Sequence, residues 1–244
     1  MTSFIASMPI SKDNFETGYF WEYYMDLERQ FIDFTKYVPY LDGNENVYSF
    51  RLVNLILAIG AHVDSVFKEM FRCSDFSTKY PDILKKINDG KATITDYREI
   101  EKEYYISKRK VVFKRLPERE TIFPFQQFGT KSPDWWSAYN KIKHEFSQNF
   151  KMATLKTARD ALACAFLLNV VHKPAILRLF EYGVVKSKYP EWVVYGDQHT
   201  ALLEEPTINV LYDILKTTIY PPLYVETNLF YFDYESPNKL SPSH

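Results

Sequence analysis

Apolar residues in the first half of the chain recur at the three- and four-residue spacing of α-helices. Between residues 20 and 36 they form a single stripe, which predicts a helix with one face packed on a core. The stripe consists of Phe20, Tyr24, Leu27, Phe31 and Phe34. Residues 47–71 are apolar nearly all round, so we expect a central, buried helix there. Shorter helices are predicted at 81–88 and at about 95–105.

The pattern changes after residue 105. Residues 106–128 look extended or looped, with short runs of β-branched and aromatic residues broken by prolines. Ser132-Pro133-Asp134 predicts a helix start, with Ser132 as N-cap and proline at the first helical position. A second strongly apolar helix is predicted at 152–171. Towards the C-terminus we expect a short hairpin at 184–195, a helix at 206–220, and a strand or aromatic tail at 229–234.

Together these elements predict a mainly helical single domain over residues 1–244, with a small extended or β excursion and an aromatic C-terminal segment. The hydrophobic fraction of 46% and the charged fraction of 25% are those of an ordinary globular protein. The net charge of −1 provides no global field that would attract nucleic acid or an anionic membrane. Any nucleic-acid binding must therefore come from a local patch.

Motif searches exclude several classes of site. Neither GxGxxG nor GxxxxGK occurs, and the histidines lack the spacing of zinc ligands, so we expect no cofactor and no metal. The two cysteines, Cys73 and Cys164, are far apart in the sequence, which favours a reducing compartment. The N-terminus does not resemble a secretion signal, and the apolar run at 161–168 is shorter than the roughly 20 residues that span a bilayer. We expect a cytoplasmic protein without membrane association.

The segment 135–144, Trp-Trp-Ser-Ala-Tyr-Asn-Lys-Ile-Lys-His, is the best candidate for a functional site. On a helix Trp136, Asn140 and His144 share one face, with Tyr139 and Lys143 beside them. Metal-free RNA cleavage needs such a set, because an imidazole can exchange a proton with the 2′-hydroxyl or the leaving oxygen. Asn140 and Lys143 would hold the phosphate, and Lys141, Tyr139 and Trp136 are further candidates for RNA contact. The structural alternative is that the two tryptophans and Tyr139 are core anchors, while Asn140 and His144 cap or cross-link neighbouring helices.

Two further features have both a functional and a structural interpretation. Asp64 either orients His144, as carboxylates do for catalytic imidazoles, or forms an intrahelical ion pair with Lys68. A basic strip just before the candidate helix either binds the RNA backbone or is solvated surface. It consists of Lys108, Arg109, Lys110, Lys114, Arg115 and Arg119, of which Arg109, Lys114 and Arg115 are our candidate RNA contacts.

Several of these motifs together resemble bacterial proteins of the HEPN-like class. They are Tyr48-Ser-Phe, Gly60-Ala-His-Val-Asp64, Pro124-Phe and Trp135-Trp-x-x-Tyr-Asn-x-x-Lys-His144. The resemblance covers residues 47–171, with 175–244 as a C-terminal extension. It implies an antiparallel helical bundle, often a homodimer that juxtaposes two sites. It also implies His144 as general acid/base, Asn140 and Lys143 as phosphate contacts and Asp64 as the supporting acid.

Members of that class include metal-independent ribonucleases of toxin and phage-defence systems, and proteins that only bind RNA or nucleotide. Active members usually carry an arginine a turn or two before the histidine, and no arginine occurs between Asp134 and Lys143. The sequence therefore supports two main hypotheses, beside a third in which the aromatic segment 229–234 is a partner-docking or dimer element. The first is an RNA-cleaving effector, a homodimer with an antitoxin or other protein partner. The second is a non-catalytic module that binds RNA, nucleotide or a protein.

Overall fold

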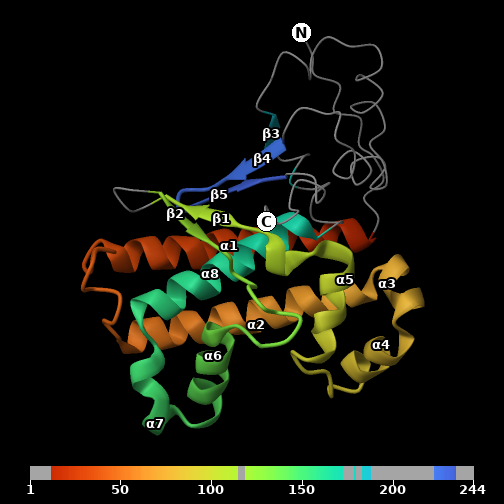
Figure 1. Cartoon of the computed structure of the whole chain (residues 1–244), viewed down its shortest axis with the longest axis horizontal. Coiled ribbons are helices and arrows are strands. Elements are labelled where there is room, and N and C mark those ends of the chain that lie inside the picture. The colour runs from red at the N-terminus through yellow and green to blue at the C-terminus, as the bar shows by residue number, and fades with distance from the viewer. Residues whose placement is uncertain (1–11, 115–118, 173–178, 180–182, 188–222, 235–244) are drawn as a thin grey trace, which may run out of the picture.

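The computed structural model describes residues 12–114, 119–172, 179, 183–187 and 223–234, and shows a mostly helical protein with a small antiparallel sheet (Figure 1). The α-helices are α1 (Lys12–Thr35), α2 (Phe50–Arg72), α3 (Ser74–Lys79), α4 (Pro81–Asn88), α5 (Glu101–Tyr104), α6 (Asp134–His144), α7 (Phe146–Asn149) and α8 (Leu155–Val171). Short 3-10 helices are η1 (Asp96–Ile100), η2 (Ile106–Lys108) and η3 (Phe150–Met152). The strands are β1 (Val111–Phe113), β2 (Glu120–Ile122), β3 (Val185–Ser187), β4 (Leu223–Glu226) and β5 (Phe230–Asp233).

The core lies between α1, α2 and α8, which pack on one another. The predicted stripe on α1 is confirmed, since Tyr24, Leu27 and Phe31 are fully buried. Helix α2 is the predicted central helix, and α8 is buried over most of its length. Both helices have side-chain N-caps. Ser49 Oγ accepts from the Leu52 amide, and Thr154 Oγ1 accepts from the Thr157 amide, which satisfies amides that the helix itself leaves unpaired.

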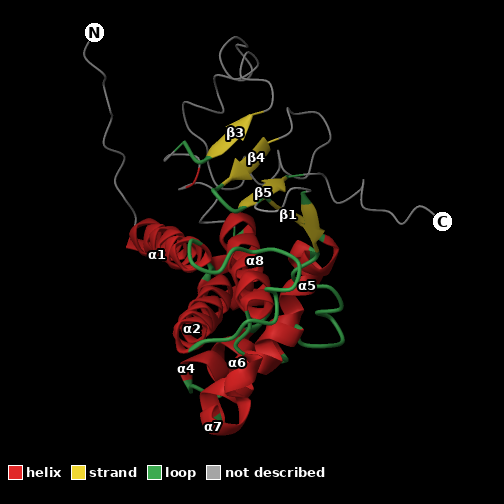
Figure 2. Ribbon diagram, turned by 90° about the vertical axis from the view of Figure 1, so that its left-hand side faces the viewer, coloured by secondary structure: helices red, strands yellow, loops and turns green. Residues whose placement is uncertain are grey.

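The sheet has the strand order β2-β1-β5-β4-β3, with antiparallel pairing throughout. It therefore joins the extended excursion of residues 111–122 to strands near the C-terminus, in the register Val112 opposite Tyr231. Figures 1 and 2 show the sheet lying over α1 and α8. The Phe166 ring of α8 stacks on Phe230 of β5, with centroids 5.5 Å apart, and so helps to hold the sheet on the helices.

A buried carboxylate fixes the turn between β4 and β5 to α1. Glu28 is only 1% exposed and accepts hydrogen bonds from the Tyr24 hydroxyl (2.5 Å), the Thr227 hydroxyl (2.6 Å) and the Asn228 amide (3.1 Å). Three donors compensate for the loss of hydration of the buried carboxylate. The C-terminal strands are thus attached to the helical core by polar as well as apolar contacts.

Some predicted helices start or continue differently in the structure: the helix predicted at 152–171, for example, begins at Leu155. Helix α6 begins at Asp134, and Pro133 rather than Ser132 is the N-cap residue, because Pro133 has the extended ψ of 146° and no side chain caps the helix. The helix predicted at 95–105 is divided into η1 and α5, and Tyr105 ends it in the left-handed conformation (φ 48°). The helix predicted at 206–220 and the hairpin at 184–195, apart from β3, lie outside the described residues.

Among the described helices, α2 alone is long and apolar enough to cross a membrane by length and composition. The sequence-based prediction took only the shorter run at 161–168 into account. However, 56% of the apolar window of α2 is buried within the protein, as in the core helix of a globular fold. This property is therefore weak evidence for a membrane span.

Candidate functional site

Helix α6 has one side buried in the core and the other exposed to solvent: Ile142, in its last turn, is still 1% exposed, whereas Asp134 at its start is exposed. Trp135, Trp136 and Tyr139 are 4–6% exposed, whereas Asn140 is half-buried and His144 is exposed. The Trp135 indole Nε1 donates to Cys164 Sγ of α8 (2.8 Å), and this thiol contacts the Pro124 carbonyl (3.1 Å). The structural interpretation of the two tryptophans and Tyr139 is confirmed, because all three anchor α6 in the core.

Tyr139 packs directly on α2. Its ring lies over Gly60, where an added Cβ atom would overlap the ring carbons. Glycine is needed here for close approach of the two helices rather than for an unusual backbone conformation. The Lys143 ammonium sits 5.6 Å from the centre of the same ring, a cation–π distance. Gly60 therefore sets how closely α6 packs, and Tyr139 in turn supports Lys143.

We expect Gly60→Ala to lower the free energy of unfolding by about 2 kcal/mol, because overpacking outweighs the gain in helix propensity. Urea unfolding followed by circular dichroism would measure the change. Gly129→Ala is the matched control, since its Cβ would meet no atom closer than 4.0 Å. In the Tyr139→Ala background the Gly60→Ala substitution should cost much less. An equal cost in both backgrounds would contradict the proposed contact.

The last turn of α6 carries Lys141, Lys143 and His144, all exposed, and we call this set the basic end of α6. The amide of Glu145 caps the helix at the Lys141 carbonyl (2.8 Å), and Asn149 Nδ2 donates to the Glu145 carbonyl (3.0 Å). These bonds fix the corner between α6 and α7. Within the described chain, neither Asn140 nor His144 forms a side-chain hydrogen bond or an ion pair. Figures 1 and 2 place α7 at the end of the helical part opposite the sheet.

Asp64 of α2 has partners other than the predicted one, His144. It forms an ion pair with Lys68 (2.5 Å) and accepts a hydrogen bond from the Tyr97 hydroxyl (2.9 Å). The intrahelical ion pair proposed from the sequence is confirmed. Burial, together with the Asp64 carboxylate, raises the pKa of Tyr97 above its ordinary range. The structure therefore brings Asp64 to Tyr97, and not to His144.

Two of the three candidate RNA contacts in the basic strip, Arg109 and Lys114, make structural contacts, whereas Lys108, Lys110 and Arg119 of the strip are exposed. Lys114 Nζ pairs with Glu226 (2.6 Å) and donates to the Thr227 carbonyl (2.8 Å), which links β1 to the β4–β5 turn. Arg109 Nε donates to the Tyr104 carbonyl (2.8 Å). Arg115 lies outside the described residues. Arg109 and Lys114 therefore make their contacts away from the basic end of α6, and each stabilises the fold locally.

Sequence reasoning missed an exposed aromatic cluster, which consists of Tyr48, Phe50, Phe146 and Phe150. Phe50 is 67% exposed, and Tyr48 and Phe146 are each 42% exposed. Phe50 stacks on Phe150 with centroids 4.7 Å apart and on Phe146 at 6.1 Å, while Tyr48 meets Phe150 edge to face. The four-residue spacing of Phe146 and Phe150 was the available signal, but the meeting with Phe50 depends on the tertiary fold.

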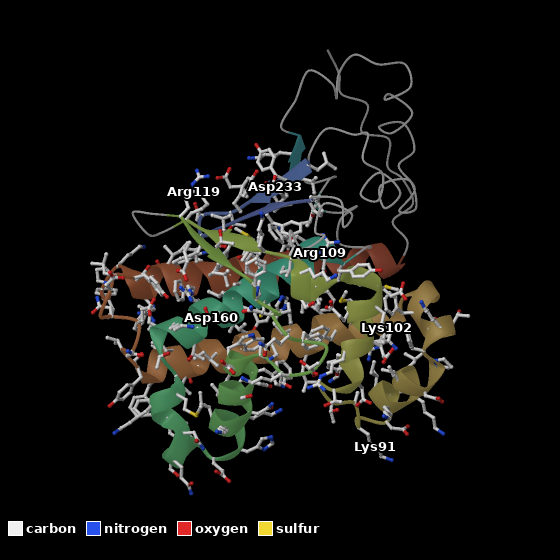
Figure 3. All side chains as sticks on the ribbon, in the orientation of Figure 1. Lys91, Lys102, Arg109, Arg119, Asp160 and Asp233 are labelled. Carbon is white, nitrogen blue, oxygen red and sulfur yellow. The ribbon has the colours of Figure 1, made fainter. Side chains whose placement is uncertain are left out.

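A polar cavity of about 480 Å³ lies near the opposite end of α6. Its wall includes Arg159 and Asp160 of α8, and Figure 3 labels Asp160. Arg159 is 4% exposed at its side chain and bonds both Glu120 (2.5 Å) and Asp160 (2.6 Å). The Lys156 ammonium also pairs with Asp160 (2.5 Å). These charges neutralise one another, so the pairs account for the polar lining without a ligand.

Among the described residues, no group of three or more His, Cys, Asp or Glu side chains is arranged to hold a metal ion. The fold and the candidate site define a mainly helical protein with a small antiparallel sheet and an exposed basic and aromatic surface at one end. Comparisons with protein-family models, with curated proteins and with solved structures found no match. The HEPN-like resemblance accordingly stays a prediction from sequence motifs.

Proposed function

We propose that this protein binds RNA through the basic end of α6. The observation that supports this function is that the two lysines of this helix end form no ion pair with the described residues. Within the described chain Lys141 and Lys143 form no ion pair, whereas Lys68, Lys114 and Lys156 are each neutralised by a carboxylate. Two unneutralised ammonium groups on one helix turn can replace the counterions of a phosphate backbone, even in a protein with a net charge of −1.

The binding test compares Lys141→Ala/Lys143→Ala with the parent, using a fluorescently labelled single-stranded RNA and fluorescence anisotropy. We expect about tenfold weaker binding, and a salt dependence shallower by roughly 0.7 for each phosphate that the variant no longer neutralises. Lys85→Ala/Lys91→Ala is the matched control, because both lysines are exposed near α4 (Lys91 is labelled in Figure 3). Equal weakening by the two double variants would reject the basic end of α6 as the site of RNA binding.

The second candidate function is metal-independent cleavage of RNA by His144. It is favoured by the exposure of His144, which has no bonding partner for its side chain in the described chain and lies one turn from Asn140. Cleavage requires one group to take the 2′-hydroxyl proton and another to protonate the leaving oxygen. One imidazole supplies only one of these at a time, so we propose that a homodimer brings two copies of His144 together, with Asn140 where active HEPN-like proteins usually carry an arginine and Lys143 as a phosphate contact.

Cleavage is tested by incubating the parent and His144→Ala with end-labelled RNA in EDTA. The second candidate predicts products with cyclic-phosphate ends from the parent alone, and an activity loss of at least about a hundredfold in the variant. His144→Ala should retain most of its RNA affinity, because Lys141 and Lys143 remain. Cleavage that persists in His144→Ala would reject His144 as the catalytic group. If the parent binds RNA but does not cleave it, RNA binding is supported and cleavage by His144 is rejected.

A further inference from the structure

We propose that the aromatic cluster of Tyr48, Phe50, Phe146 and Phe150 stacks on the bases of single-stranded RNA held by the neighbouring cations. This inference rests on the proposed function and names its ligand class, RNA with unpaired bases. It assigns a role to four residues to which neither the HEPN-like resemblance nor the chemistry of His144 gives one.

Three of the rings are exposed, and the fourth, Phe150, is partly buried against the core. Phe50 is the first residue of α2, Phe146 is the first residue of α7, and Phe150 begins η3, so three different elements support them. Tyr48 is bridged to Thr154 in an isolated antiparallel pair, which fixes the segment ahead of α2 against the start of α8. Because the rings are already ordered, stacking a base on them requires little additional loss of side-chain entropy.

Charge complementarity favours nucleic acid as the occupant. The aromatic cluster is interleaved along the chain with cations, since residues 141–151 contain Lys141, Lys143 and Lys151 but only one acid, Glu145. Arg51, which is exposed, follows Phe50 directly. Aromatic rings beside unneutralised lysines are the usual composition of surfaces that bind single strands, in which bases stack and cations contact the phosphates.

A second copy of the chain fits the aromatic cluster less well than single-stranded RNA does. The rings expose roughly 300–400 Å² of surface between them, whereas a standard stable interface covers about 800 Å² on each partner. Burying Arg51 against the Arg51 of a second copy would add repulsion. A double helix is also a poorer occupant, because its bases are already stacked and cannot cover the Phe50 ring.

The test uses three labelled probes of equal length: single-stranded oligouridylate, a fully abasic phosphodiester strand, and duplex RNA. We expect Phe50→Ala and Phe146→Ala each to weaken oligouridylate binding about tenfold, the effect of removing one base stack. Binding of the abasic strand should not change, because that strand has phosphates but no bases. Phe50→Trp should restore or strengthen binding. Phe123→Ala is the matched control, as Phe123 is 44% exposed and outside the cluster.

The outcomes separate this inference from the function on which it rests. If the parent binds the abasic strand as tightly as oligouridylate, and Lys141→Ala/Lys143→Ala weakens both, RNA binding by the lysines stands and the stacking inference is wrong. A lower oligomeric mass for Phe50→Ala in light scattering would identify the cluster as an interface between copies, and would also overturn the inference. Absence of RNA binding by the parent would reject both proposals.

Discussion

Lowering the pH from about 7 to about 5 should reduce the free energy of unfolding by about 4 kcal/mol, with two buried histidines each contributing about 2 kcal/mol. Burial lowers the pKa of His62 to about 4 and that of His172 to about 3. His62 is 2% exposed, and its Nε2 accepts a hydrogen bond from Asn169 Nδ2 (2.9 Å). His172 is 1% exposed, with Nε2 3.5 Å from Cys73 Sγ.

Acid should lower the free energy of unfolding because the two imidazoles bind protons more readily in the unfolded chain. Above about pH 6.5 both imidazoles are neutral in the folded and the unfolded chain, so they do not make stability depend on pH. Below that pH the unfolded chain gains two protons that the folded chain excludes, and stability falls. The loss from His62 is complete near pH 4 and that from His172 near pH 3. Most carboxylates titrate below about pH 5, so the interval from about pH 7 to 5 reports mainly on histidines.

Urea unfolding at a series of pH values would measure this slope. The double variant His62→Gln/His172→Gln should be less stable at neutral pH but should show a much flatter profile between about pH 7 and 5. His144→Gln is the control for the substitution itself, because that side chain is exposed. A slope that persists in the double variant would show that other groups cause the acid sensitivity.

Replacing Arg159 with leucine should lower the free energy of unfolding by about 3 kcal/mol or more, since breaking a buried ion pair leaves charges without compensation. Its guanidinium joins Asp160 of α8 to Glu120 of β2, and lies 5.2 Å from the Tyr40 ring and 5.8 Å from the Phe113 ring. One side chain therefore connects α8, the β1–β2 hairpin and the segment after α1.

Urea unfolding of three further variants would separate the contribution of the Arg159 charge to stability from that of its packing. Arg159→Lys keeps the charge but loses the planar guanidinium group that bonds two carboxylates at once. We therefore expect it to be markedly less stable than the parent. Adding Glu120→Gln to Arg159→Leu should recover part of the loss, because it removes the carboxylate that has lost its ion-pair partner, whereas Asp160 keeps its pair with Lys156. Lys156→Ala, at a half-exposed position in the same network, should change stability by less than about 1 kcal/mol. A loss below about 1 kcal/mol for Arg159→Leu itself would contradict a structural role for its buried ion pairs.

Much of the helical structure could be predicted from the sequence. The stripe from Phe20 to Phe34 and the apolar segments that became α2 and α8 identified three core helices, because the spacing of apolar residues records which side of a helix is buried. Prediction was poorer at helix ends. Ser132 was a plausible N-cap by residue type, yet the backbone at Pro133 determined where α6 begins. End residues depend on local backbone angles that composition does not specify.

The candidate site was only partly accessible from the sequence. The motif at 135–144 located α6 and its exposed His144, but spacing alone could not tell that Trp136 and Tyr139 point into the core while His144 reaches solvent. That difference arises because one side of α6, from Trp135 to Ile142, packs on the core, while His144 lies on the side that faces solvent. The role of Asp64 was likewise ambiguous, since its partners were Lys68, four residues away, and Tyr97, which only the packing of η1 on α2 brings within reach.

The sequence by itself determined the helical class, the core faces and the residue types available for chemistry, because burial periodicity and charge are local properties of the chain. Tertiary structure alone decided which distant segments meet: Val112 with Tyr231 in the sheet, Gly60 under Tyr139, Arg159 with Glu120, and Phe50 with Phe146. Apolar periodicity shows that a face is buried but not what covers it. Partners distant in sequence are selected by the packing of the whole chain.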